Sequence, residues 1–289
     1  NFFDKKKYDC LGFEPSTNVA KLAENKNLSI IPDFFSVNNE LSKKFIGKTK
    51  VIYAANVICH IPDLNNLIKT IDRFLGKKGL FIFEEPYLGS MVKKVSYDQI
   101  YDEHVYIFSV SSIKKIFHKF GYELIDSIPQ TTHGGSMRYV IARKGVYEIQ
   151  KSVSENQEYE KKVKLDNFEG LLDFKKKCAL SKEQILFKLN EYKKRGLSIA
   201  GYAATSKSTT ILNYCGIDNK VIDCIYDTTP DKIGKFSPGM HIPIMEYDKF
   251  KNNYPDVVYL FAWNHKDEIL KKEKIYSEKG GKWFSHVNL

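Results

Sequence analysis

The feature that most constrains the fold is an alternation of short apolar strands and helices in the first third of the chain. Apolar runs at residues 8–13, 28–35, 50–55 and 80–83 have the length of buried strands, and helical patterns lie between them. Repeated strand, helix, strand connections favour a parallel sheet. The sequence therefore predicts an α/β fold with a Rossmann-like sheet.

Polar residues follow each predicted strand, and in an open parallel sheet the carboxyl ends of the strands form the ligand side. Glu14 follows the first strand, where an acid can bind the hydroxyls of a ribose, although it can equally serve as a helix N-cap partner. Asp33 and Phe34 can hydrogen-bond to an adenine and stack on it, although core packing is the alternative for Phe34 and Phe35 and is expected to hold for one of them. Asn56 and His60 follow the third strand, and a single histidine there is more often a core residue than a catalytic one.

The nine residues 96–104, SYDQIYDEH, hold two tyrosines, three acids and a histidine. A plain surface loop explains such a run as well as an active site does. Its groups can move protons, however, and it lies shortly after the strand at 80–83. The stretch is therefore the first candidate for the chemistry.

The second half of the chain repeats the α/β rhythm. Charged helical segments at residues 146–195 predict two helices that link to a further domain. A strand and a small-residue turn then lead into a helix near Ser206, where Lys207 and Ser208 could contact a phosphate. The spacing is neither Gly-x-Gly-x-x-Gly nor a P-loop. The expected parts are a Rossmann-like core at 1–145, the helical linker at 146–195 and a smaller Rossmann-like domain at 196–289.

Composition limits the partners. The net charge of +10 arises from 45 basic and 35 acidic residues, but most of the excess is lysine in runs typical of solvated helix faces, and arginine is scarce, so no nucleic-acid partner is expected. The five widely spaced cysteines indicate reduced core thiols of a cytoplasmic protein rather than a disulfide framework or a zinc site. No apolar run approaches the roughly 20 residues that cross a bilayer, so no membrane partner is expected.

Several motifs together resemble the S-adenosylmethionine-dependent sugar C-methyltransferases, which act on nucleotide-linked 4-keto-6-deoxysugars. The resemblance covers nearly the whole chain. Its motifs are EEPYLG at 84–89, YDQIYDEH at 97–104, HGGSMRY at 133–139, GYAATSKS at 201–208, NYCGI at 213–217, DTTPDK at 227–232 and PGMHIP at 238–243.

The resemblance implies site residues and partners. It assigns Glu14, Asp33, Phe34 and Asn56 to S-adenosylmethionine, and a nucleotide-diphosphate sugar to Tyr87, Arg138, Lys207 and Ser208. A monomer is expected. Family members begin with a zinc-binding domain and a glycine-rich cofactor loop, neither of which we find here, so zinc is expected only in that domain and no metal site in this chain. Asn1 to Asp4 instead resemble a helix end leading into the first strand.

The implied reaction removes a proton beside a ketone and places a methyl group on the resulting carbon nucleophile, with C-3 favoured. His104 is the candidate base because imidazole titrates near neutral pH, and Glu103 or Asp102 would orient its ring. Tyr101 and His60 are the candidate donors to the enolate oxygen or to sugar hydroxyls.

Two interpretations from other classes remain. A catalytically silent, truncated paralogue would bind a sugar nucleotide or a partner protein without transferring a methyl group. A nicotinamide-dependent oxidoreductase would suit two Rossmann-like halves, but no Gly-x-Gly-x-x-Gly follows a predicted strand.

Overall fold

The structure is a computed structural model that describes residues 7–287 and comprises two compact units. The first unit contains the residues up to Glu85 together with Val110–Ile128 and Arg138–Asn156, and the second contains Pro86–Ser109, Pro129–Met137 and the residues from Gln157 onward. The helix end expected at Asn1 to Asp4 lies outside the described residues. The division of the chain at residues 145 and 195 stays a prediction.

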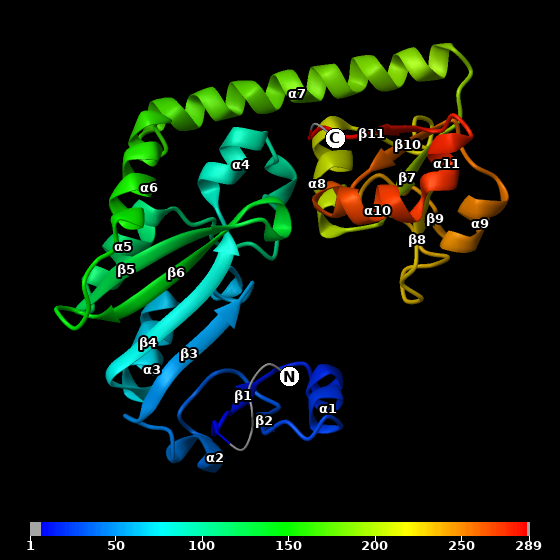
Figure 1. Cartoon of the computed structure of the whole chain (residues 1–289). Helices are drawn as coiled ribbons and strands as arrows, with labels where there is room; N and C mark the ends of the chain where they lie inside the picture. The colour runs from blue at the N-terminus through cyan, green and yellow to red at the C-terminus, as the bar shows by residue number, and fades with distance from the viewer. Residues whose placement is uncertain (1–6, 288–289) are drawn as a thin grey trace. The chain divides into compact units, whose positions relative to one another are not determined.

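Strands and helices alternate in the first unit as the sequence predicts (Figure 1). Its elements, in chain order, are β1 (Gly12–Phe13), α1 (Thr17–Glu24), β2 (Ile30–Ile31), α2 (Glu40–Lys43), β3 (Thr49–Ala55), η1 (Ile58–His60), α3 (Leu64–Phe74), β4 (Leu75–Pro86), α5 (Val110–His118), β5 (Tyr122–Gln130) and β6 (Ser136–Arg143). The tips of β4, β5 and β6 extend into the second unit.

The α/β fold is confirmed, but the first four predicted strands do not share one sheet. β1 and β2 pair in parallel as a separate two-stranded sheet, whereas β3 pairs in parallel with β4 in a sheet of order β3-β4-β6-β5. Within residues 7–287 no strand pairs with both β1 and β3, and two-residue strands cannot extend the larger sheet by themselves. The strand predicted at residues 80–83 is longer in the structure, because residues 76–79 also lie inside β4, where the register of its pairing with β3 shifts.

Aromatic side chains form the core of the four-stranded sheet. The Phe83 side chain is fully buried, and its ring centroid lies 4.9 Å from that of Phe81 and 4.9 Å from that of Tyr139. Phe117 of α5 packs 5.9 Å from Phe83, so α5 covers this face of the sheet. The apolar face of α5 is thus buried, with Ile113 at 1% and Phe117 at 3% exposure.

A five-stranded parallel sheet forms the centre of the second unit, in the order β11-β10-β7-β8-β9. Two helices, α6 and α7, lie within residues 146–195, but the apolar residues on which the prediction of two helices rests, at 168–172 and 185–189, fall in α7 alone. The residues of α6 up to Asn156 belong to the first unit. The elements, in chain order, are α4 (Leu88–Lys94), η2 (Tyr97–Gln99), η3 (Thr132–Gly134), α6 (Lys151–Lys162), α7 (Phe168–Lys194), β7 (Ile199–Tyr202), α8 (Ser206–Cys215), β8 (Ile225–Asp227), β9 (Ile244–Glu246), α9 (Tyr247–Asn252), β10 (Val257–Leu260), η4 (Trp263–His265), α10 (Lys266–Lys272), α11 (Lys274–Glu278) and β11 (Lys282–Phe284).

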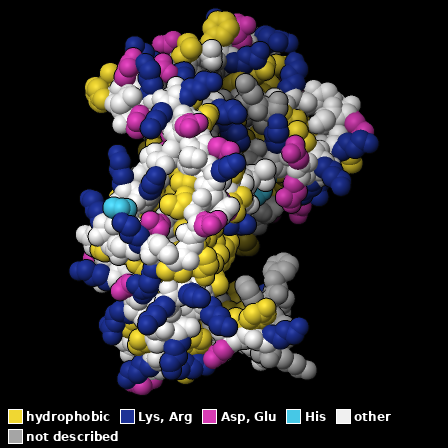
Figure 2. Space-filling model, turned by 60° about the vertical axis from the view of Figure 1, so that its left-hand side comes forward, with side chains coloured by type: hydrophobic (Ala, Val, Ile, Leu, Met, Phe, Trp, Pro, Cys, Tyr) yellow, Lys and Arg dark blue, Asp and Glu magenta, His cyan; other side chains and the backbone are white. Residues whose placement is uncertain are grey.

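The described surface agrees with the charge pattern of the sequence. Figure 2 shows Lys and Arg side chains scattered over the visible face with Asp and Glu among them, as expected for solvated helix faces. All five cysteines are free thiols, and Cys59, Cys178 and Cys215 are buried as predicted, whereas Cys10 is exposed. Between residues 7 and 287, no helix combines the length and the apolar character that crossing a membrane requires.

The aromatic core gives a stability prediction. Phe83→Ala should lower the free energy of unfolding by about 3–5 kcal/mol, because it removes a buried ring and leaves a cavity. Urea denaturation followed by circular dichroism measures the loss. Leu22→Ala on the exposed face of α1 is the matched control and should change the stability by about 0.5 kcal/mol or less. If Phe83→Ala lowered the free energy of unfolding by no more than Leu22→Ala does, the packing described for this core would be contradicted.

Candidate active site

The segment after α4 holds the candidate base in a defined hydrogen-bond chain. His104 Nε2 lies 2.8 Å from the Tyr101 hydroxyl, and His104 Nδ1 lies 2.8 Å from the Gln99 carbonyl oxygen. The two rings are 4.0 Å apart between centroids. Tyr101 and His104 are both partly exposed, so the pair is accessible while its geometry is held locally.

These contacts fix which nitrogen of His104 carries the proton. A carbonyl oxygen only accepts hydrogen bonds, so Nδ1 must donate to Gln99. In the neutral ring Nε2 is then the acceptor, and the Tyr101 hydroxyl donates to it. The arrangement presents the basic nitrogen beside a phenol, which is the chemistry of a general base with a neighbouring hydrogen-bond donor.

The other residues predicted for proton transfer occupy different positions. Glu103 is exposed on the same loop, and the Gln99 carbonyl makes an orienting contact to the ring of the kind that the sequence assigns to Glu103 or Asp102. His60 ends η1 after β3 and belongs to the first unit, whereas Tyr101, Glu103 and His104 belong to the second. The roles of Glu103 and His60 stay predictions.

Glu14 and Asp33 follow two adjacent parallel strands, as the sequence predicts. The Glu14 backbone N–H donates to the Ile31 carbonyl at 3.0 Å, which keeps Glu14 beside the end of β2. One Glu14 carboxylate oxygen accepts the Ser16 N–H at 2.8 Å, so the acid also serves the start of α1, the alternative that the sequence left open. Asp33 accepts the Phe34 N–H at 2.7 Å.

Of the two phenylalanines after β2, Phe35 packs in the core and Phe34 is exposed. Phe35 packs 5.1 Å from Phe13 and 5.0 Å from Phe74, so core packing holds for this ring. The Phe34 side chain is 74% exposed. A large exposed aromatic ring next to an acid is a surface on which a flat heterocycle can stack, and the assignment of Phe34 to an adenine stays a prediction.

Two acceptor atoms at the carboxyl ends of β3 and β4 are buried without a hydrogen-bond partner among the described residues. They are Asn56 Oδ1 and Glu85 Oε2. Asn56 has a left-handed backbone (φ 54°), and its N–H donates to the Glu84 carbonyl. Buried acceptors normally find a donor, so this pair is suited to a ligand that brings an N–H or ammonium group. The methionine ammonium of S-adenosylmethionine is such a group, and the residues present fit it.

Glu85 ties β4 to the segment after β3. Its Oε1 accepts the Val57 N–H at 3.0 Å and the Ile58 N–H at 2.7 Å. Burial raises the pKa of Glu85 above its usual value, although these hydrogen bonds favour the charged form. The pKa of the neighbouring Cys59 thiol is also raised, first by burial and then by the Glu85 charge, so Cys59 is a packed thiol rather than a nucleophile.

Lys207 and Asn264 lie side by side at the carboxyl end of the parallel sheet in the second unit. Lys207 is in the first turn of α8, and its Nζ lies 3.4 Å from Asn264 Oδ1. Burial lowers the pKa of Lys207, and the charge of Asp98 partly offsets that effect. Ser208 is buried, and its hydroxyl donates to the Thr205 carbonyl at 2.6 Å, which completes the cap of the helix. The sequence missed Asn264 because no motif marks it.

Tyr87 and Arg138 have partners within their own units. The Tyr87 side chain is 6% exposed, and its hydroxyl donates to Glu160 of α6 at 3.0 Å. Arg138 donates through Nε and Nη2 to Glu84 Oε2, at 3.2 Å and 2.9 Å. Both contacts stabilise the fold, and substrate binding by Tyr87 or Arg138 stays a prediction.

Comparison with known proteins relates both halves of the chain to methyltransferases. The family model described as "C-methyltransferase C-terminal domain" matches residues 131–287, and the one described as "Methyltransferase domain" matches residues 1–127. The C-methyltransferase NovU of Streptomyces niveus is 29% identical over 276 residues, which are 94% of this chain and 66% of that protein. The chain thus spans about two-thirds of the length of this relative.

Solved structures are more distant. The PH0226 protein of Pyrococcus horikoshii OT3 is 15% identical with a TM-score of 0.36, over 48% of this chain and 74% of that one. A SAM-dependent methyltransferase of Anabaena variabilis ATCC 29413 is 17% identical with a TM-score of 0.35, over 46% of this chain and 68% of that one.

The buried Glu85 predicts a pH dependence of stability. A carboxyl whose pKa is raised by folding binds its proton more tightly in the folded state, so the stability falls as the pH rises from the usual glutamate pKa through the raised one. Each unit of increase corresponds to about 1.4 kcal/mol. Glu85→Gln keeps an acceptor for Val57 and Ile58 and should remove this dependence. Urea midpoints between pH 4 and 8 measure it, and parallel pH curves for the two proteins would contradict the prediction.

Proposed function

The chain belongs to the C-methyltransferase family, and from that membership we propose that it transfers a methyl group from S-adenosylmethionine to a carbon, favouring C-3, beside the 4-keto group of a nucleotide-linked deoxysugar. The observation that carries the proposal is the hydrogen-bond chain from Tyr101 through His104 to the Gln99 carbonyl. A base of this kind is what carbon methylation beside a ketone requires, since the carbon must lose a proton before it can attack.

The cofactor would be held by the first unit. Glu14 would bind the ribose hydroxyls, Asp33 and Phe34 the edge and the face of the adenine, and Asn56 the methionine end. Support comes from the exposed Phe34 ring and from the buried acceptor of Asn56. When bound, S-adenosylmethionine supplies an electrophilic methyl group on a sulfonium.

The residues of the second unit would move the proton. His104 Nε2 takes the proton from the carbon beside the ketone, and the electron pair of the broken C–H bond delocalises onto the carbonyl oxygen as an enolate. The enolate carbon would then form the new C–C bond to the methyl group while the bond from that methyl group to the sulfonium sulfur breaks, which would leave a neutral thioether and restore the carbonyl. Tyr101 supplies a hydroxyl for the developing oxyanion, a contribution of about 10²–10³-fold in rate. The proton leaves His104 to water after release.

The sugar nucleotide would bind through its diphosphate. Lys207 and Asn264 offer an ammonium and an amide at the amino end of α8, which suits a phosphate group. Burial disfavours the charged form of Lys207 and lowers its pKa, so an anion beside the ammonium group would stabilise that charge and raise the pKa again. Arg138 and Ser208 are secondary candidates for the same ligand.

The experiment that tests the function is methyl transfer by this chain alone. Tritiated S-adenosylmethionine is incubated with the chain and a nucleoside-diphosphate 4-keto-6-deoxysugar, and tritium in the sugar is measured after separation. Turnover supports the proposal. Binding of the sugar nucleotide in calorimetry without any methyl transfer would favour the second candidate, a silent sugar-nucleotide-binding protein.

His104→Asn should lower kcat by about 10²–10⁴-fold, because it removes the base. Cofactor affinity, measured by calorimetry, should stay within twofold. His241→Asn is the matched control, since His241 is exposed and has a left-handed backbone (φ 54°) that asparagine tolerates. Near-normal turnover in His104→Asn would exclude this residue as the base.

Lys207→Ala should weaken binding of the sugar nucleotide about 10–100-fold, the range expected for loss of a charged hydrogen bond. Calorimetry with the nucleoside diphosphate alone should show the same loss, because the contact is to phosphate. Lys220→Ala, an exposed lysine of the same unit, serves as the control. Unchanged affinity in Lys207→Ala would place the diphosphate elsewhere.

A further inference from the structure

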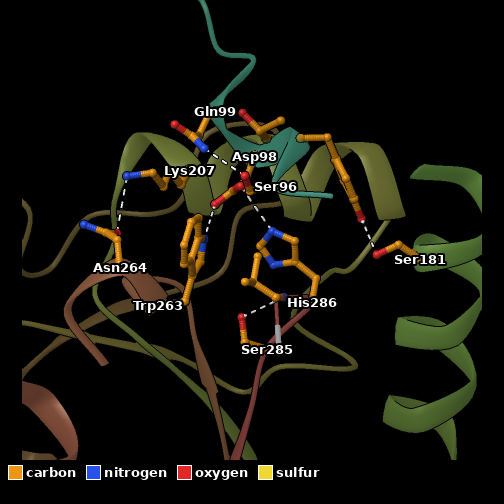
Figure 3. Close-up of polar contacts among 12 residues, drawn as sticks. Ser96, Asp98, Gln99, Ser181, Lys207, Trp263, Asn264, Ser285 and His286 are labelled. Carbon is orange, nitrogen blue, oxygen red and sulfur yellow. Dashed lines mark hydrogen bonds and ion pairs between the residues drawn. The ribbon is translucent and has the colours of Figure 1, made fainter. Parts of the chain in front are cut away.

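Asp98 is a fully buried carboxylate in the middle of the segment that carries the candidate base. Figure 3 shows its side chain between Trp263 and His286. The Trp263 indole N–H donates to Asp98 Oδ2 at 2.6 Å, and His286 Nε2 lies 3.2 Å from Asp98 Oδ1. Both side chains of the Asp98–His286 pair are completely buried. A charge buried to this degree is strongly destabilising if its partners are removed, so these contacts hold Asp98 in place.

Trp263 is itself fixed from a second direction. Its ring packs against Gly134, where an added Cβ atom would come within 2.1 Å of the indole. Gly134 has a backbone φ of 83°, and its carbonyl accepts the Lys94 ammonium, which lies 5.9 Å from the centre of the Trp263 ring. Only glycine allows the loop to approach the indole so closely. Trp263 is therefore a rigid anchor for Asp98.

The anchored carboxylate fixes the turn that follows it. Asp98 lies in η2, and the next residue, Gln99, is 2% exposed, with its side-chain amide donating to Ser96 Oγ at 2.8 Å. Two further contacts hold the backbone, the Ile100 N–H to the Tyr97 carbonyl and the Thr210 hydroxyl to the Ile100 carbonyl. The Gln99 carbonyl, which accepts the His104 Nδ1 proton, is thus one peptide away from the buried carboxylate.

Three titratable groups of its own unit, His286, Tyr259 and Lys207, interact with Asp98. His286 pairs with Asp98 and has the Tyr259 hydroxyl 3.2 Å from its Nδ1. The charge of Asp98 acts to raise the pKa of Lys207 and partly offsets the larger effect of burial. A buried carboxylate with polar partners is a poor source of net stability, since well-packed apolar residues often replace such a group without loss. Hydrogen bonds are directional, so the contacts of Asp98 can hold the turn before His104 in one geometry. Apolar packing around the turn would not do this.

We propose that Asp98 is a positioning residue for His104: held by Trp263 and His286, it sets the η2 turn so that the Gln99 carbonyl keeps the neutral imidazole protonated on Nδ1 and basic on Nε2. The proposal rests on the proposed function in one respect, namely that His104 is the base of the methyl transfer. The placement of the proton on the ring is a property of the protein without substrate.

Asp98→Asn tests the proposal by a measurement that does not need activity. Nitrogen-15 spectra of the histidine rings distinguish Nδ1–H from Nε2–H, and the spectrum of His104→Asn identifies the His104 signals among the seven histidines. The wild-type ring should be the Nδ1–H form. In Asp98→Asn the two forms should mix, because the amide has one acceptor oxygen where the carboxylate has two, so it cannot accept hydrogen bonds from both Trp263 and His286. An unchanged ring tautomer would overturn the proposal.

Kinetics give the second measurement. Asp98→Asn should lower kcat about 10–100-fold while the KM for the cofactor changes less than threefold, the loss expected from misplacing a base. Glu273→Gln is the matched control, a buried carboxylate of the same unit that accepts the Tyr202 and Tyr247 hydroxyls. Glu273→Gln should lower the free energy of unfolding but should leave kcat nearly unchanged. An equal kcat loss in Glu273→Gln would show that general destabilisation explains the effect and would overturn the proposal.

Trp263→Phe separates the anchor from the carboxylate. It keeps an aromatic ring and removes the indole N–H, so it should shift the His104 tautomer in the same direction as Asp98→Asn, and the double variant should add little to either change. If the tautomer shifts of Asp98→Asn and Trp263→Phe added up in the double variant, Trp263 and Asp98 would act on His104 independently, which would contradict the proposal. If the wild-type chain transfers no methyl group, the proposed function fails, and the ring spectra still decide whether Asp98 positions His104.

Discussion

The structure depends on carboxylates that are buried and supplied with donors. The described residues that are both charged and buried are all acidic, although the chain carries a net charge of +10: Glu84, Glu85, Asp98, Glu160, Asp227 and Glu273. Lysine and arginine can bury their alkyl stems and leave the charge in water, whereas a carboxylate has a short stem and can accept several hydrogen bonds at once. Glu85 accepts two backbone N–H groups, Asp98 accepts an indole N–H and faces an imidazole, and Glu273 accepts two tyrosine hydroxyls.

Each of these contacts joins segments that hydrophobic packing alone would leave free to slide. Glu85 sets the direction in which the chain leaves β3, and the Glu84–Arg138 pair joins β4 to β6. In the second unit, Glu160 holds Tyr87 at the start of α4, and Asp227 accepts the Ala204 N–H after β7. Glu84 and Glu85 lie at the end of β4 and Asp227 at the end of β8, so these three acids belong both to the polar network and to the ligand side of the sheets.

Local patterns in the sequence were sufficient for most elements. Apolar runs located β3 and β4, and the small-residue turn after the next predicted strand located the start of α8. Longer-range features were not visible. Asp98 and Trp263 are separated by 165 positions, and nothing in either neighbourhood indicates the contact. The Gln99 carbonyl could not be predicted either, because every residue has a carbonyl and only the backbone path decides where it points. The division into two sheets in the first unit depends on strand pairing, which apolar runs do not specify.

A carbonyl as the partner of His104 has a consequence that an acid in its place would not have. A carbonyl has no proton to donate at any pH, so the neutral ring keeps its hydrogen on Nδ1, and the chain of hydrogen bonds runs in one direction, from Tyr101 through His104 to Gln99. When Nε2 gains a proton it becomes a donor, and the Tyr101 oxygen must then accept from it. The tyrosine hydrogen has to turn away from the ring and becomes available to another acceptor. Under the proposed reaction, the step that consumes the base therefore also frees a donor for the enolate oxygen that the same step creates.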